Sequence, residues 1–138
     1  MGDTKLSRKI ELHFGSLFGK WTNKTELIVF NPPWLAETRD LNNLDEAIYY
    51  NDTLFSEFFE AAKQMLLPDG KLVLIFSNFA QITGVAKSNP IEQEIAEGGR
   101  FQLEKCYKKS VKKGSDKTKR DLDHRKNEEV ELWVLTHV

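Results

Sequence analysis

The residues with the clearest capacity for chemistry are four in a row, Asn31-Pro32-Pro33-Trp34. The asparagine carboxamide donates and accepts hydrogen bonds, and the tryptophan indole offers a large planar surface. Two successive prolines lack N–H donors and fix φ near about −65°, so they end a strand and stiffen the corner. Because ligands bind at the carboxyl ends of strands in open α/β sheets, we predict a ligand site here.

The element that must position this corner is the apolar block directly before it, Glu26 to Phe30. A short continuous apolar run predicts a strand that is buried on both faces of a parallel sheet. A second run of this kind, Lys71 to Phe76, predicts another such strand. Ser77-Asn78 follows it, in the place equivalent to Asn31.

Between these two runs the chain predicts a helix over residues 54–66. Asn51 or Asp52 can cap its first turn, and Pro68-Asp69-Gly70 is expected to end it. Its apolar residues recur at helical spacing, which predicts a core-facing stripe rather than a ligand pocket. These residues are Leu54, Phe55, Phe58, Phe59, Ala62 and Leu66.

The remaining pattern completes an α/β arrangement. Alternation over Ile10 to Phe14 predicts a first strand, and Asn89 with Glu92 predicts a capped helix from Pro90 to Glu97. Two further strands are expected over residues 101–111 and 130–138, and they could form an antiparallel hairpin. Strands and helices that alternate in the middle imply a parallel sheet with helices on its faces.

Composition bounds the class of protein. The chain has 138 residues, of which 40% are hydrophobic, and it reads as a single domain. No apolar run approaches the ~20 residues that span a bilayer, and no signal pattern opens the chain. One cysteine, Cys106, suits a reducing, cytoplasmic compartment. The three histidines are scattered without a cysteine cluster, so we expect no metal site.

The corner and its surroundings resemble class I methyltransferases that use S-adenosylmethionine and methylate planar amino or amide nitrogens. Asn31-Pro32-Pro33-Trp34 is similar to their [Asn/Asp/Ser]-Pro-Pro-aromatic signature. Residues 67–74 resemble the family's lead into its fifth strand, and the terminal hairpin resembles its sixth and seventh strands. Gly15-Ser16-Leu17-Phe18 is similar to the family's Gly-Asp-Leu-Phe stretch, whose aspartate reaches adenine. Ser16 stands in its place, so the resemblance implies cofactor contacts from Ser16, Leu17 and Asn31.

The resemblance covers only the second half of the family's domain. A Gly-rich cofactor loop and the first two strands would precede Glu26, and no Gly-x-Gly element occurs there. We therefore expect a truncated Rossmann-like sheet, with strands like the family's 3-4-5-6-7, that is inactive alone and binds S-adenosylmethionine weakly or not at all. In the family order 3-2-1-4-5-7-6, the Glu26 to Phe30 strand would have an open edge. Open edges invite pairing with another chain, so we expect a homo-oligomer or pairing with a missing amino-terminal half.

The resemblance also assigns chemical roles. The Asn31 carboxamide and the Pro32 carbonyl would accept the N–H bonds of the methylated nitrogen and stabilise its growing charge. Trp34 would stack on the planar acceptor, and Pro32 with Pro33 would hold the corner rigid. The implied acceptor is an exocyclic amine of an RNA or DNA base, or next a protein glutamine amide. The loop over residues 35–50 is expected to determine which of these acceptors is methylated.

Two alternatives remain open at this stage. Asn-Pro-Pro could be an ordinary turn at the end of a strand, with Trp34 in the core. The chain could also be a non-catalytic half-domain that serves as an assembly or interaction module.

The charge distribution suggests a partner. Lys105 to Lys126 holds ten basic and three acidic residues, a net charge of +7, while the whole chain carries −1. If the strand before it runs parallel to Glu26–Phe30, this stretch lies at the edge that holds Asn31 and would suit a nucleic-acid backbone. Tyr107 is its only aromatic residue, and a solvated hairpin tip is the alternative.

Overall fold

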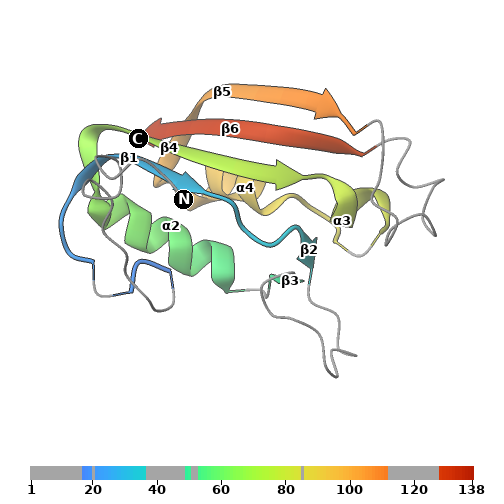
Figure 1. The fold of residues 1–138 in the computed structure, drawn as a ribbon, viewed down its shortest axis with the longest axis horizontal. Helices are drawn as coiled ribbons and strands as arrows, with labels where there is room; N and C mark the ends of the chain where they lie inside the picture. Colours follow the sequence, from blue (N-terminus) through green and yellow to red (C-terminus); the bar gives the residue numbers. More distant parts are fainter. Residues whose placement is uncertain (1–16, 20, 37–48, 51–52, 85, 112–127) are drawn as a thin grey trace, which may run out of the picture.

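The computed structural model describes residues 17–19, 21–36, 49–50, 53–84, 86–111 and 128–138, and these form an α/β fold (Figure 1). A four-stranded sheet contains β1 (Thr25–Phe30), β4 (Leu66–Ser77), β6 (Glu129–His137) and β5 (Phe101–Ser110), in that spatial order. The helices are α2 (Leu54–Met65), α3 (Phe79–Ile82) and α4 (Pro90–Gln93), which continues as the π-helix η1 (Glu94–Gly98). None of the helices in these ranges is long and apolar enough to cross a membrane.

Two segments differ from expectation or lie outside these ranges. The predicted strand Ile10 to Phe14 belongs to the residues that the structure does not describe. The stretch from Leu35 to Tyr50, predicted as a loop, begins and ends in short strands, β2 (Leu35–Ala36) and β3 (Tyr49–Tyr50). These two strands pair in parallel, which brings the ends of the stretch together.

The strand directions place three carboxyl ends at one edge of the sheet. β1 and β4 are parallel, whereas β6 is antiparallel to both β4 and β5. β5 therefore runs parallel to β1 and β4, as the arrowheads in Figure 1 show. The predicted antiparallel terminal hairpin is confirmed, and the end of β5 lies at the same edge of the sheet as Asn31 and Ser77.

The core lies between the sheet and α2, as the phenylalanine stripe predicts. The rings of Phe30 and Phe58 stack with centroids 4.0 Å apart, and Phe55 meets Phe76 edge-on at 5.4 Å. Phe59 reaches β5, where its ring centroid is 5.9 Å from that of Phe101. Aromatic pairs at these separations add to the stability that burial provides. Helix α2 therefore packs against β1, β4 and β5 in a single core.

The prediction that β1 is buried on both faces is wrong. Ile28 is buried against α2, but the neighbouring side chains Leu27 and Val29 are 54% and 59% exposed. Successive residues of a strand point to opposite faces, and α2 and α4 both pack on the face that holds Ile28. We call the other side of the sheet the outer face; the pairing register assigns to it Leu27, Val29, Val73, Ile75, Leu132 and Val134.

Pro68-Asp69-Gly70, predicted to end the helix, is instead an irregular part of β4. Helix α2 ends at Met65, and Leu66 is already extended, with φ −85° and ψ 131°. The pairing with β1 passes from Thr25 opposite Leu66 to Leu27 opposite Lys71, so two steps along β1 match five along β4. Pro68 has no N–H to donate to the ladder, which fits a bulge at this point.

Helix α4 begins where the sequence indicates. The Asn89 side chain accepts hydrogen bonds from the backbone N–H groups of Ile91 and Glu92, at 2.8 and 3.4 Å, and Pro90 occupies the first turn. The predicted range is correct within one residue, but its second half is the π-helix η1. Gly99 ends it with φ 71°, a conformation that side chains with a Cβ rarely adopt.

Candidate functional site

The Asn31-Pro32-Pro33-Trp34 corner lies where β1 stops pairing with β4. Asn31 is exposed, Pro32 is buried, and Pro33 and Trp34 are half-buried. The Trp34 Nε1–H donates to the backbone carbonyl of Ile75 at 3.3 Å, just beyond Leu74, the last residue of β4 that β1 pairs with. The indole thus anchors the corner against β4 and leaves the Asn31 carboxamide facing solvent.

The turn that contains Leu17 is connected to this corner by stacked aromatic rings. Phe18 stacks on Phe58 with centroids 5.7 Å apart, and Phe58 in turn stacks on Phe30, the residue before Asn31. Leu17 has a positive φ of 52°, an uncommon conformation for its side chain. The aromatic stack therefore joins the chain neighbours of Leu17 and Asn31, two of the three predicted cofactor contacts, while Ser16 lies outside the described residues.

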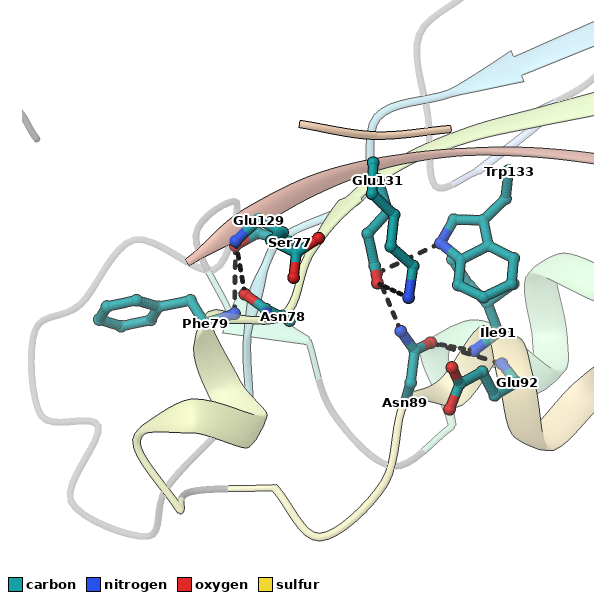
Figure 2. A network of polar contacts seen from close by, with 10 residues as sticks. Ser77, Asn78, Phe79, Asn89, Ile91, Glu92, Glu129, Glu131 and Trp133 are labelled. Carbon is teal, nitrogen blue, oxygen red and sulfur yellow. Dashed lines mark hydrogen bonds and ion pairs between the residues drawn. The ribbon is translucent and has the colours of Figure 1, made fainter. Parts of the chain in front are cut away.

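Ser77 and Asn78 occupy the equivalent end of β4, but their polar groups serve the fold (Figure 2). The Ser77 hydroxyl donates to Glu128 Oε1 at 3.0 Å and accepts from the Phe79 N–H at 3.1 Å. Asn78 Oδ1 accepts from the Glu129 N–H at 2.8 Å, which closes the end of the β4–β6 ladder. Asn31 is thus the more accessible of the two carboxamides for a ligand.

A second polar group, centred on Glu131, joins β6 to α4 and was not anticipated (Figure 2). Its Oε1 accepts from Asn89 Nδ2 at 3.1 Å and from Trp133 Nε1 at 3.3 Å. The side chain is only 5% exposed, and Lys108 Nζ lies 3.7 Å from its second oxygen. Burial raises the pKa of the Glu131 carboxyl, although the hydrogen bond from Trp133 opposes this.

The sequence does contain a signal for this group. Glu131, Trp133 and Leu135 alternate along β6 and all face the core. A charged residue in the buried phase of such an alternation indicates a partner inside the protein.

Cys106 lies opposite Trp133 on β5 and is not a candidate nucleophile. Burial and then the negative charge of nearby Glu131 raise the pKa of its thiol. A raised pKa keeps the sulfur protonated at neutral pH, whereas reactive cysteines have lowered values.

The basic stretch is only partly described, through Lys105, Lys108 and Lys109 on β5. Lys108 points to the helix-covered face, opposite Glu131, while its neighbours point to the outer face. The carboxyl end of β5 lies at the edge of the sheet that holds Asn31, as the parallel arrangement requires.

The fold and this corner define an α/β protein consistent with the methyltransferase class. The chain belongs to the BMT5-like family, described as "rRNA (uridine-N3-)-methyltransferase BTM5-like", whose model matches residues 4–113. This range contains the Asn31 corner and most of the sheet. No curated protein matches the chain. The family is one of RNA methyltransferases, for which S-adenosylmethionine is the methyl donor.

Proposed function

We propose that this chain carries the acceptor-binding corner of an enzyme that methylates a base nitrogen of RNA. The observation that carries the proposal is the exposed Asn31 carboxamide, held by the buried Pro32 at the carboxyl end of β1 in a chain of this family. α/β proteins bind ligands at that end of the sheet, where Asn31 offers an exposed hydrogen-bonding group.

The strand order supports a closer assignment within the methyltransferase class. The described sheet has the order β1-β4-β6-β5, with only β6 antiparallel to its neighbours. The last four strands of the order 3-2-1-4-5-7-6 follow the same path when β1 is equated with the fourth strand. We propose this equivalence, which makes Asn31-Pro32-Pro33-Trp34 the group that follows the fourth strand.

The residues fit the acceptor side of a methyl transfer. S-adenosylmethionine supplies an electrophilic methyl group when it is bound. An exocyclic amine presents two N–H bonds, which the Asn31 side-chain oxygen and the Pro32 carbonyl would accept. These bonds orient the nitrogen lone pair and stabilise positive charge that develops on the nitrogen.

Trp34 plays a different part in this proposal. Its N–H is already bound to Ile75, so the indole can offer only a ring surface to the acceptor. Because the ring is half-buried against the core, its position is fixed before an acceptor base arrives. Stacking a base on a fixed aromatic ring stabilises binding by roughly 1 to 3 kcal/mol.

The cofactor side is less complete in the described residues. Leu17 and Asn31 are the two predicted contacts that are described, and both side chains are exposed. They could border a cofactor, but they provide no buried charged or polar partner for it. The described residues therefore fit the methyl-accepting side of the site, and weak binding of S-adenosylmethionine by this chain stays a prediction.

The acceptor atom separates two versions of the proposal. The family description names uridine N3, a ring nitrogen with one N–H between two carbonyl groups. At that acceptor, the Asn31 amide would instead donate a hydrogen bond to a carbonyl oxygen. We propose the exocyclic amine, whose two N–H bonds would use both the Asn31 oxygen and the Pro32 carbonyl.

A methylation assay distinguishes these acceptors. The full-length protein would be incubated with S-adenosylmethionine labelled in the methyl group and with single-stranded RNAs that contain only adenosine, only cytidine or only uridine. We expect label on the adenosine or cytidine amino group, identified by mass spectrometry of the nucleosides. Label on uridine would show that the acceptor is the ring nitrogen and not an exocyclic amine. Label on a glutamine peptide but on no RNA would overturn the proposal.

A second candidate function, an assembly module, is favoured by one observation. β1 pairs only with β4 among the described strands, and it exposes Leu27 and Val29. A strand edge with exposed apolar side chains is a template for pairing with another chain. Two copies of β1 could pair through these side chains without bringing like charges together. We therefore propose that the partner is a second copy of this chain.

Self-association through β1 should be visible by sedimentation velocity. We expect the wild-type chain to form dimers at high concentration, and Leu27→Lys with Val29→Lys to shift the population to monomers, because lysine on an edge strand opposes pairing. Leu103→Lys is the matched control, since Leu103 is also exposed but lies on β5. A wild-type chain that stays monomeric at all concentrations would contradict the assembly function.

A further inference from the structure

The edge strand β5 presents a charged and aromatic pattern on the outer face of the sheet. In the pairing register, Lys105, Tyr107 and Lys109 lie opposite Val134, Leu132 and Val130 of β6. Residues directly opposite in an antiparallel pair share a face, so these three side chains project from the same side. Tyr107 is 54% exposed, and both lysines are exposed.

The charge of this strip is not neutralised within the described part of the chain. None of the ion pairs there involves Lys105 or Lys109. The adjacent Glu104 is paired with Lys71 at 2.9 Å, and Glu128 is buried, with one oxygen bound to the Ser77 hydroxyl. Lys108 belongs to the other face, where it is close to Glu131.

We propose that Lys105, Tyr107 and Lys109 form a binding strip for single-stranded RNA beside the methylation corner, an inference that rests on the proposed function. The lysines would contact phosphates, and a base would stack on the Tyr107 ring. Proteins bind single strands in this manner, with basic groups along the backbone and aromatic rings under the bases.

The position of the strip relative to Asn31 supports this partner. β5 ends at the same edge as β1, three strand spacings away, which corresponds to roughly 14 Å. An RNA strand that crosses this edge could place one nucleotide at the Asn31 corner and a neighbour on Tyr107. A second copy of this chain suits the strip less well, because two copies would bring its lysines together.

The test measures binding of a fluorescein-labelled, mixed-sequence 12-nucleotide single-stranded RNA by anisotropy, across a salt series and without a methyl donor. We expect Lys105→Ser with Lys109→Ser to weaken binding and to reduce the slope of log affinity against log salt by roughly 1.4, about 0.7 for each lost phosphate contact. Tyr107→Ser should weaken binding about ten-fold with little change in slope, and Tyr107→Phe should keep it.

The matched control is Lys24→Ser, which removes an exposed lysine just before β1. β1 and β5 are the two outermost strands of the four-stranded sheet, so this lysine is far from the strip. Wild-type affinity in the Lys105/Lys109 and Tyr107→Ser variants, or no RNA binding by the wild-type chain, would overturn the proposal. A change in sedimentation mass of Tyr107→Ser without a change in RNA affinity would reassign the strip to protein contact. Because the assay contains no methyl donor, its result is independent of whether methyl transfer occurs.

Discussion

Replacing Asn31 by alanine is expected to slow methyl transfer by the full-length protein by roughly 10²- to 10³-fold and to leave its fold intact. The side chain is exposed at the end of β1, so its loss removes little buried surface. It does remove a preorganised group at the position where charge develops on the acceptor, and deletion of one such group costs about 10²- to 10³-fold in rate. The measurements are kcat/KM for the RNA acceptor and the thermal midpoint of unfolding.

Two further variants make this prediction specific. Asn31→Asp keeps a side-chain oxygen acceptor but loses the N–H donors, so it should retain more activity than alanine if the acceptor is an exocyclic amine. Asn23→Ala removes another exposed asparagine side chain, ahead of β1, and should behave as wild type. Wild-type turnover by Asn31→Ala would show that the corner is an ordinary turn.

Replacing Glu131 by alanine is expected to cause a large loss of stability. The change leaves the Asn89 Nδ2–H and the Trp133 Nε1–H buried without their acceptor. Each buried donor left unsatisfied costs about 1 to 3 kcal/mol, so the free energy of unfolding should fall by about 2 to 6 kcal/mol. Urea unfolding at neutral pH measures this difference.

Glu131→Gln separates the hydrogen bonds from the charge. The glutamine oxygen can accept from both Asn89 and Trp133, so stability at neutral pH should be close to or above that of wild type. Burial raises the folded-state pKa of Glu131 above its ordinary value of 4.5, so the folded protein holds the proton more tightly. Wild-type stability therefore falls as pH rises from about 4.5 through the folded-state pKa, and this contribution is absent in Glu131→Gln.

The control for this comparison is Glu26→Gln, an exposed carboxylate on β1. The stability difference between Glu131→Gln and wild type should grow in favour of glutamine as pH rises through that window. An equal difference at every pH between 4.5 and 7.5 would mean that the charge of Glu131 carries no burial penalty.

Local patterns were sufficient to predict most of the elements. The spacing of Phe55, Phe58 and Phe59 predicts α2 and its buried face, because helical periodicity and core packing agree there. Asn89 with Pro90 predicts the start of α4, since a capping side chain acts on residues next to it. Helical periodicity and capping therefore predicted these two helices, whereas the equally local signal Pro68-Asp69-Gly70 lies inside β4 and does not mark the end of α2.

Features set by distant contacts were less accessible. Leu27 and Val29 have the sequence of a strand covered on both sides, and only the placement of α2 and α4 on one face shows that they are exposed. Glu131 is charged, so its burial depends on Trp133, two residues away on β6, and on Asn89, which is distant in sequence. At the corner, the sequence predicted that Asn31 follows the carboxyl end of a strand but not the hydrogen bond that anchors Trp34 to Ile75.

The irregularities of the sheet have a consequence for how this chain can vary in length. Register shifts occur near the start of β4 and between Leu103 and Lys105 of β5. Towards the other end, residues 72–77 of β4 pair with β6 without interruption. Insertions and deletions should therefore be tolerated at the amino ends of the parallel strands, while the edge that carries Asn31 keeps a constant spacing.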